Sequence, residues 1–478
     1  MKYVTEGLEP RRVLELFEEI SAIPRASGNE AAIAAWIEKF AKERGCFCLK
    51  DKSNNVFVRV PASAGREHEA AVLLQGHTDM VCEKNSDTEH DFSSEGLKLY
   101  LEDGWLRARG TTLGGDDGAA VAIMLAVIDG CLESHPTVEC LFTTDEEVGL
   151  LGAGSFDYSV ITAKSMINLD SEEEGAVIVG CAGGVRSDVE IPIKFQPVRG
   201  EVLKISLTGL CGGHSGENIN CGRANASKLM GRLLLAVSRK MRVNLISVSG
   251  GTKDNAIPRE AFAEISVANA ERAARAVMSE VNRVRGELCA EDAQLTVVCS
   301  VPADACESMM TAESTRRVLA LLGTVQNGVI EMSRDVPGLV GFSRNLGVVK
   351  TNENSVSFIF SSRSALESQL DASVDSLDAL AAALGGKTRH YSRYPGWSYA
   401  QRSPIRNKYL KAATRVLGYE PKVMMIHAGL ECGIIRSRLP KLDMIAIGPD
   451  MRGIHSPDEA LSIASMENVW KIVAEMLK

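Results

Sequence analysis

The sequence predicts an α/β domain whose chain is interrupted by an inserted α+β domain, and three observations support this division. Up to about residue 183, helical patterns alternate with short apolar runs of β-forming residues, which is typical of a sheet covered by helices. Near residue 184 the pattern changes to half-exposed strands in a β-α-β-β-α-β order. After Pro395 the α/β pattern returns. We therefore predict one domain from residues 1–183 and 389–478, with residues 184–388 inserted.

Two helices and two short strands open the predicted first domain. Apolar residues recur at helical spacing over residues 11–20 and again over residues 33–40. The run Ser27-Gly28-Asn29-Glu30 has the form of a capping box and predicts the start of the second helix, which Gly45 ends. Strands are expected near residues 46–50 and 56–60.

A buried strand is predicted over residues 70–77, and it ends at His77. Asp79 follows two residues later, so in extended chain both side chains point to one side of the strand. A histidine that binds a metal is often oriented by such a carboxylate. The alternative is that the two residues are ordinary polar groups of a loop.

Acidic residues also follow the next strand-like segments. The strand predicted over residues 138–144 leads into Asp145, Glu146 and Glu147, which repel one another unless a cation compensates them. The segment 166–169 ends at Asp170. The alternative for the three adjacent acids is a solvated charge run at the start of a helix.

Glycines flank Asp116 and Asp117 at the entrance of an apolar helix expected over residues 119–128. This pattern suits carboxylates held at an unusual backbone angle, and the alternative is that the two acids complement the helix dipole. Four successive segments thus place acids or a histidine where one edge of a sheet gathers them.

The inserted region contains strands, helices and a glycine-rich loop that carries His214. A looser repeat of the same strand and helix order runs from about residue 311 to 384. The strands are predicted near residues 201–208, 243–249, 261–268, 294–301, 329–333, 340–349 and 355–361, and the helices near 223–239 and up to 287.

The last segment supplies a second histidine, His455. Strands are predicted at residues 423–427 and 442–446, and a final helix from a cap at Ser465. Ser456-Pro457-Asp458-Glu459 has the form of a capping box, which would fix the backbone beside His455 and leave its ring free. The alternative is a plain loop histidine.

Composition excludes several classes of protein. The chain has 53 basic and 62 acidic residues, a net charge of −9, and no basic stretch, so nucleic acid is not an expected partner. The longest apolar run is too short to cross a membrane, and the first residues lack the apolar core of a signal peptide. The twelve cysteines are scattered without a Cys-x-x-Cys pair, which favours reduced thiols in the cytoplasm.

Histidine nitrogens and carboxylate oxygens without thiolates form the donor set of catalytic zinc sites. The sequence also resembles the co-catalytic zinc dipeptidases and aminoacylases. The resemblance covers nearly the whole chain through nine motifs in order: QGHTDM, TTLGGDDG, TTDEEVGL, NLDSEEEG, GLCGGHSGENINCGRANA, DNAIPRE, SSRSAL, HAGLECG and GIHSPDE. It implies a mixed-sheet zinc-exopeptidase catalytic domain with an inserted α+β domain that acts as a lid and in dimerisation.

The resemblance also implies roles for individual residues. Two divalent ions, zinc or its substitutes cobalt and manganese, would share a water. The implied ligands are Asp116 as the bridge, His77 and Asp170 on one ion, and Glu147 and His455 on the other. Asp79 would orient His77, and Glu146 would be the general base. A cis peptide is implied between Asp116 and Asp117.

Three residues of the inserted domain resemble groups that contact the substrate. His214 would stabilise the oxyanion, and in relatives this histidine comes from the partner subunit or after lid closure. Arg363 and Asn255 would bind the C-terminal carboxylate of a small peptide substrate. The alternatives are a surface arginine and an ordinary loop histidine.

The leading hypothesis is a cytoplasmic, homodimeric dipeptidase that cleaves dipeptides ending in histidine and other unblocked dipeptides. The nearest alternative removes the acyl group from N-acyl amino acids with the same two metals. A non-catalytic peptide-binding protein and a protein with one structural zinc are less consistent, because Glu146 is present and no cysteine cluster is available.

Overall fold

The computed structural model describes residues 3–302, 306–334 and 336–478, which form two compact units. The first unit consists of Met1–Cys181, Trp397–Met425 and Leu430–Lys478, and the second of Ala182–Gly396 and Ile426–Gly429. Both units combine helices with sheets, and the first has a mixed sheet, so the predicted α/β class with mixed sheets is confirmed.

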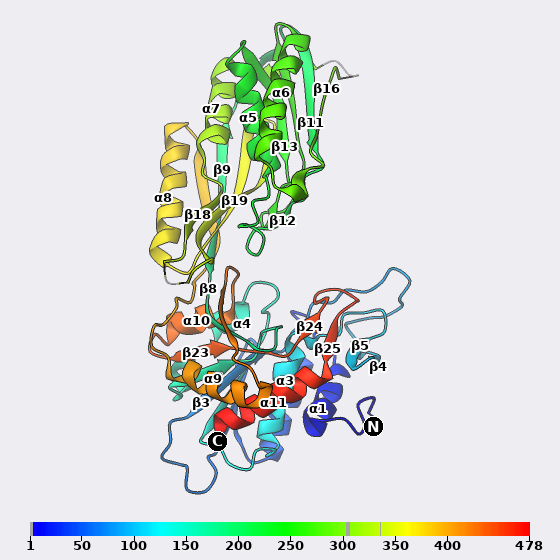
Figure 1. Cartoon of the computed structure of the whole chain (residues 1–478), viewed down its shortest axis with the longest axis vertical. Helices are drawn as coiled ribbons and strands as arrows, with labels where there is room; N and C mark the ends of the chain where they lie inside the picture. Colours follow the sequence, from blue (N-terminus) through cyan, green and yellow to red (C-terminus); the bar gives the residue numbers. More distant parts are fainter. Residues whose placement is uncertain (1–2, 303–305, 335) are drawn as a thin grey trace. The chain divides into compact units, whose positions relative to one another are not determined.

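The first unit is built on a sheet with the strand order β1-β2-β6-β3-β7-β23-β8-β22. Its strands are β1 (Phe47–Lys50), β2 (Val56–Val60), β3 (Val72–His77), β6 (Val138–Thr143), β7 (Ser165–Asn168), β8 (Ala176–Cys181), β22 (Lys422–Ile426) and β23 (Asp443–Ala446). Figure 1 labels three of these strands, β3, β8 and β23. The neighbours β6, β3, β7 and β23 are parallel. Their carboxyl ends therefore meet at one edge of the sheet.

Helices cover this sheet and bury its apolar side chains. They are α1 (Arg11–Ser21), α2 (Ala31–Glu43), α3 (Gly115–Ile128), α4 (Leu151–Ser155), α9 (Pro404–Leu417), α10 (Glu431–Arg438) and α11 (Ile463–Leu477). One apolar core joins α1, α2, α3, α9 and α11 to the strands, while α10 packs against α4. The apolar run from Ala119 to Ile128 is buried throughout, as the sequence predicts for a core helix.

Gly76 allows α3 to approach β3 closely. A Cβ at this position would lie 2.4 Å from an Asp117 oxygen and 2.5 Å from Ala120 Cβ, so a larger residue would push the start of α3 away from the strand. The start of α3 is irregular: Asp116 and Asp117 have non-helical backbone angles, and the peptide bond between them is cis, as the resemblance implies.

A small sheet in the order β24-β25-β5-β4 positions the loop that carries His455. Its strands are β4 (Leu99–Glu102), β5 (Trp105–Ala108), β24 (Met451–Arg452) and β25 (Ala460–Ser462). The strand β4 is short, and none of its residues is buried. The loop between β24 and β25 contains both His455 and Glu459.

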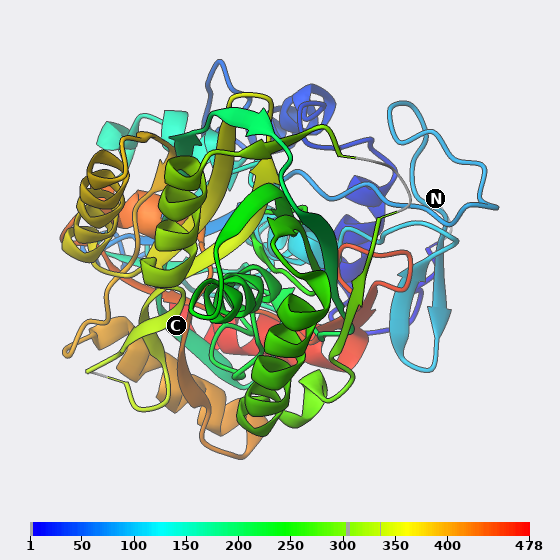
Figure 2. The same ribbon diagram turned by 90° about the horizontal axis from the view of Figure 1, so that it is seen from above.

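The second unit is a nine-stranded sheet with helices along one face (Figure 2). The strand order is β16-β11-β15-β13-β19-β20-β9-β21, and β18 also pairs with β19. The strands are β9 (Gly183–Pro192), β11 (Glu201–Thr208), β13 (Val243–Gly250), β15 (Ala261–Val267), β16 (Thr296–Ser300), β18 (Gly328–Met332), β19 (Val340–Thr351), β20 (Ser355–Ser364) and β21 (Lys387–Tyr394). The helices are α5 (Ala226–Ser238), α6 (Ala270–Val284), α7 (Ala312–Thr324) and α8 (Glu367–Ala383).

Two short strand pairs complete the second unit. They are formed by β10 (Phe195–Pro197) with β17 (Ser308–Met310) and by β12 (Gly213–His214) with β14 (Ala256–Ile257). No helix within residues 3–302, 306–334 and 336–478 combines the length and the apolar character that crossing a bilayer requires.

Two predicted helix caps are wrong. Glu30 occupies the cap position of α2 without a capping hydrogen bond, and α11 is capped by Ser462 rather than Ser465. Ser456 caps a turn as predicted, because its Oγ accepts a hydrogen bond from the Asp458 amide at 3.3 Å, but Glu459 does not complete the capping box. The side chains of Ser27, Glu30 and Glu459 bind partners distant in the sequence, which outcompete the local cap.

Candidate metal centre

The structure brings five predicted ligands together at the carboxyl edge of the first sheet. His77 is the last residue of β3, Glu147 lies in the loop after β6, and Asp170 follows β7. Asp116 lies in the first turn of α3, and His455 lies in the loop between β24 and β25. The parallel strands explain why residues so distant in the chain converge here.

The five side chains form two groups that share Asp116. The donor atoms of His77, Asp116 and Asp170 all lie within 4.8 Å of one another, and so do those of Asp116, Glu147 and His455. Asp116 Oδ1 is 3.0 Å from His77 Nε2, and Asp116 Oδ2 is 3.2 Å from His455 Nε2. Each oxygen of one carboxylate therefore faces a different histidine.

This donor set fits a pair of divalent cations. It consists of two imidazole nitrogens and carboxylate oxygens, with no cysteine in either group, which is the chemistry of catalytic rather than structural zinc sites. One carboxylate that presents an oxygen to each side is also the arrangement that a bridging ligand needs.

Asp79 connects His77 to the loop that carries the two glutamates. Its Oδ1 lies 3.3 Å from His77 Nδ1 and accepts a hydrogen bond from the Glu146 amide at 3.0 Å. Its Oδ2 accepts hydrogen bonds from the Glu147 amide and from Ser27 Oγ. The backbone carbonyl of Asp79 also lies 3.1 Å from His77 Nδ1. Asp79 thus orients the ring of one predicted ligand, and its buried carboxylate holds the backbone of another.

The charged side chains of the cluster strongly shift one another's pKa values. The Asp116 and Glu147 carboxylates raise the pKa of His455 to about 11. Burial opposes ionisation of His77, but hydrogen bonds from its ring to Asp116 and Asp79 raise its pKa well above the ordinary value. The neighbouring carboxylates therefore favour the charged form of both imidazoles when no cation is bound.

The left-handed backbone of His455 is a further sign of a constrained site, because its φ of 60° is unusual for a residue other than glycine. Asp145, immediately before Glu146, also has a positive φ, of 51°. The Glu30 carboxylate accepts a hydrogen bond from the Asp145 amide at 3.0 Å and so holds this turn.

Comparison with known proteins agrees with this geometry. Residues 73–478 match the model of Peptidase family M20/M25/M40. The chain belongs to this family. It is 38% identical over 477 residues to the cytosol non-specific dipeptidase of Escherichia coli K12, covering 98% of each protein.

Solved structures of other peptidases are also similar to this one. The aminoacylhistidine dipeptidase of Vibrio alginolyticus is 34% identical, with a TM-score of 0.93 over 100% of this chain and 98% of that one. The aminopeptidase PepT of Bacillus cereus shares the fold at 16% identity, with a TM-score of 0.58 over 98% of each chain.

The residues predicted to contact substrate in this peptidase belong to the second unit. Pairing of β12 with β14 places His214 opposite Ala256, and the Ser215 amide donates to the Asn255 carbonyl. Burial and the positive charge of Arg363 lower the pKa of His214. The structure therefore brings His214 and Asn255 together, with Arg363 near enough to act on the imidazole.

Arg363 has unused hydrogen-bonding capacity. It is 9% exposed, its Nη1 donates to Tyr394 Oη at 3.0 Å, and its Nε has no partner among the described residues. His427, which the sequence analysis did not single out, lies in the same unit, and its ring is 2.7 Å from Ser343 Oγ. Burial lowers the pKa of His427 to about 3, and the positive charge of Arg363 adds to this effect. The imidazole of His427 is therefore neutral.

Several residues around the metal centre could not be identified from the sequence. Arg25, Ser27 and Glu30 follow α1, and Glu431 and Glu459 come from the last segment. All except Ser27 are almost completely buried. These residues are distinguished by being charged and yet buried, which only the folded structure shows. From the local sequence, such residues are expected at helix caps or on the surface.

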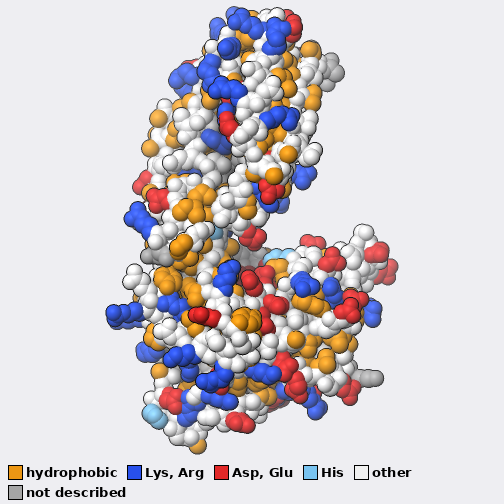
Figure 3. Space-filling view, in the orientation of Figure 1, with side chains coloured by type: hydrophobic (Ala, Val, Ile, Leu, Met, Phe, Trp, Pro, Cys, Tyr) orange, Lys and Arg blue, Asp and Glu red, His pale blue; other side chains and the backbone are white. Residues whose placement is uncertain are grey.

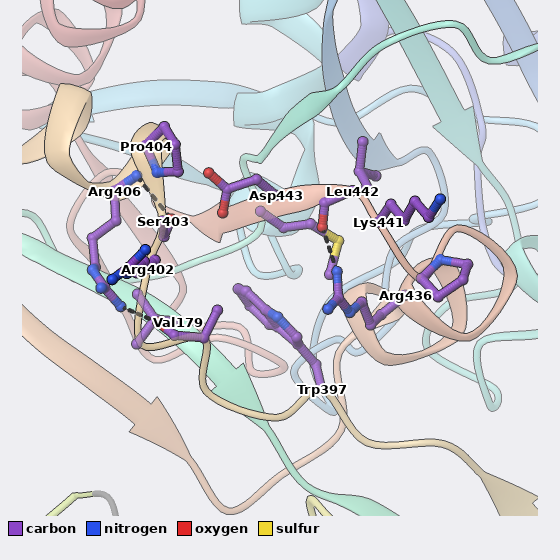
Figure 4. A pocket seen from close by; sticks show the side chains of 13 residues that line it. Val179, Trp397, Arg402, Ser403, Pro404, Arg406, Arg436, Lys441, Leu442 and Asp443 are labelled. Carbon is purple, nitrogen blue, oxygen red and sulfur yellow. Dashed lines mark hydrogen bonds between the residues drawn. The ribbon is translucent and has the colours of Figure 1, made fainter.

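A cavity in the first unit is separate from the metal centre. It has a volume of about 190 Å³ and is lined by residues that include Arg402, Arg406, Arg436 and Asp443 (Figure 4). Arg406 donates to two backbone carbonyls and Arg436 donates to the Leu442 carbonyl, so these cations already have partners. None of the predicted site residues lines this cavity.

Proposed function

We propose that this M20 peptidase hydrolyses dipeptides at a centre of two divalent metal ions, most simply zinc, in the cytoplasm. The observation that carries the proposal is the position of Asp116, whose two oxygens face His77 and His455 separately. The names of the Escherichia coli and Vibrio alginolyticus relatives, a cytosol dipeptidase and an aminoacylhistidine dipeptidase, support a dipeptide substrate.

Two bound cations would supply a polarised carbonyl and a water molecule of lowered pKa. We propose that His77 and Asp170 hold one cation, Glu147 and His455 the other, and Asp116 both. Asp79 holds the His77 ring through Nδ1, so that Nε2 faces the centre.

Glu146 is the proposed general base. Its amide is fixed by Asp79, and it precedes the proposed ligand Glu147, so its carboxylate lies beside the centre. Burial raises the pKa of Glu146 well above the ordinary value, and nearby acids add to this effect. A carboxyl with a raised pKa can accept a proton from water and then donate it to the leaving amine.

The second unit supplies the proposed substrate contacts. Arg363 has a buried Nε without a described partner, and a carboxylate is the natural acceptor for such a guanidinium. His214 is proposed to stabilise the oxyanion, and Asn255, which is exposed, to bind the carboxylate together with Arg363. If the C-terminal carboxylate of the substrate must be bound in this way, the enzyme hydrolyses only very short peptides.

Metal counting combined with a hydrolysis assay tests the function. We expect two divalent ions per chain, and activity toward Xaa-His dipeptides that a chelator abolishes and added metal restores. The same assay with acetylated amino acids separates dipeptide hydrolysis from deacylation. Light scattering tests the predicted homodimer formed through the inserted domain.

A Glu146→Gln variant tests the general base. It should keep both ions and lose about 10²–10⁴-fold in kcat, because proton transfer by a positioned side chain contributes roughly that factor. Glu133→Gln, at an exposed loop position, serves as the matched control and should behave as wild type. Full turnover by a metal-loaded Glu146→Gln variant would remove Glu146 from this role.

A further inference from the structure

The side chain of Glu459 binds four consecutive backbone amides of the loop that carries Asp116. Its Oε2 accepts hydrogen bonds from the Leu113 amide at 2.8 Å and the Gly114 amide at 3.0 Å. Its Oε1 accepts from the Gly115 amide at 2.8 Å and the Asp116 amide at 3.3 Å. Glu459 is 2% exposed, so these hydrogen bonds are shielded from water.

Arg25 binds a carbonyl of the same loop, and it also binds the loop that follows β3. Its guanidinium donates to the Gly114 carbonyl at 2.5 Å and to the Thr78 and Asp79 carbonyls at 2.9 and 3.3 Å. Arg25 is 2% exposed, and Glu459 is the leading source of negative charge acting on it. Gly114 is therefore held through its carbonyl by a cation and through its amide by an anion.

Only glycine fits at position 114. Its φ is 64°, and a Cβ there would lie 2.5 Å from an Arg25 nitrogen and 2.7 Å from Met80 Sδ. The backbone at Asp116 then departs from helical angles before the regular part of α3 begins. This irregular entrance directs the Asp116 carboxylate to its place between His77 and His455.

Glu459 is not itself placed as a metal ligand. Both of its oxygens accept amide hydrogen bonds, and it belongs to none of the groups of converging donor atoms found among the described residues. Its effect on the centre therefore passes through the backbone of residues 113–116.

We propose that Glu459 and Arg25 are positioning residues that fix the backbone of residues 113–116, so that Asp116 presents one oxygen to each metal ion. This inference depends on the proposed two-metal centre. A glutamine at position 459 has nearly the same shape but offers a donor where Oε1 or Oε2 now accepts. Two of the four amides would lose their acceptor, and the loop would relax away from its present conformation.

The test is a titration of metal-free protein with Co²⁺, followed by its visible absorption and by competition with a chelator. Loss of groups that support metal ligands typically lowers affinity by about 10–100-fold. We expect a decrease of that size for Glu459→Gln and Arg25→Lys in at least one of the two binding steps. We also expect a changed absorption spectrum, because Asp116 would no longer bridge in the same geometry.

Glu139→Gln is the matched control. Glu139 is also fully buried in the first unit and accepts the Thr162 and Ala163 amides, but it lies near the start of β6, at the opposite end from the metal centre. We expect this variant to lower the melting temperature without changing Co²⁺ affinity or the spectrum. A purely structural role for Glu459 would give the same result as this control and would overturn the proposal.

Hydrogen exchange on the metal-free wild type decides the question if the variants do not fold. The proposal requires the amides of residues 113–116 to be protected before any metal binds. Exchange of these amides at the rate of an unstructured loop would overturn it. A wild type that binds fewer than two ions would instead overturn the proposed two-metal centre, so the two failures are distinguishable.

Discussion

Glu431 offers a sharp prediction, because it is a buried acid that the proposed reaction does not use. It is the first residue of α10 and is fully buried. Its Oε2 accepts hydrogen bonds from Gln75 Nε2 at 2.5 Å and Thr143 Oγ1 at 2.6 Å, while its Oε1 has no partner within the described parts of the chain. Burial raises the pKa of Glu431 from 4.5 to about 7.

The sign of the effect on stability follows from this shift. In the unfolded chain the carboxyl loses its proton near pH 4.5, whereas in the folded chain it keeps the proton to about pH 7. Unfolding therefore becomes more favourable as the pH rises through this interval. The difference of about 2.5 pKa units corresponds to about 3 kcal/mol of unfolding free energy.

A Glu431→Gln variant removes the ionisation while keeping the shape of the side chain. We expect its unfolding free energy relative to wild type to increase by about 2–3 kcal/mol between pH 5 and pH 8. Urea unfolding of the metal-free proteins at the two pH values measures this change. Comparing each variant with wild type at the same pH cancels the titration of the groups that the Glu431 charge does not influence.

Glu431→Ala separates ionisation from packing. It should be less stable than Glu431→Gln at both pH values, because it leaves a cavity and removes the acceptor of one hydrogen bond from Gln75 and one from Thr143. Its pH-dependent component should nevertheless equal that of Glu431→Gln. Stability differences from wild type that are the same at pH 5 and pH 8 would refute the reasoning.

Two further substitutions test the roles of individual site residues. Asp79→Asn removes the negative charge beside His77 Nδ1 and should weaken metal binding by about 10–100-fold. Competition with a chelator measures this affinity. Unchanged affinity would show that Asp79 does not support His77. Arg363→Lys keeps the charge but loses the planar fork and the second donor, so the KM for dipeptides should rise by about 10-fold while metal content stays constant. An unchanged KM would place the substrate carboxylate elsewhere.

Much of the metal centre was predictable because parallel strands gather the residues that follow them. His77, Glu147 and Asp170 each lie at or just beyond a strand end, and β3, β6 and β7 are adjacent and parallel. Asp116 lies at the start of α3 and His455 in the loop between β24 and β25, so neither follows a strand of that sheet. The order of acidic segments indicated Asp116, whereas only its motif indicated that His455 belongs to the same site. Their convergence depends on the close approach of α3 to β3 and on the small sheet formed by β24 and β25.

The supporting residues could not be predicted, and the reason is energetic. Ser27, Glu30 and Glu459 all fit helix-capping patterns, and a cap stabilises a helix by about 1 kcal/mol. In the folded chain Ser27 instead donates to Asp79, and Glu30 and Glu459 accept backbone amides of the loops that carry Glu146 and Asp116. A buried amide without an acceptor costs about 1–3 kcal/mol, so satisfying several of them outweighs one exposed cap.

This competition explains why the support comes from segments far from the ligands in sequence. The turn at Asp145 has a positive φ, and Gly114 is also left-handed, so neither loop satisfies its own amides with regular helical or strand hydrogen bonds. Carboxylates must therefore reach these amides from elsewhere, and Glu30 and Glu459 do so from opposite ends of the chain. A variant that restores a good local cap but removes one of these carboxylates should consequently lose metal affinity, even where its helix content rises.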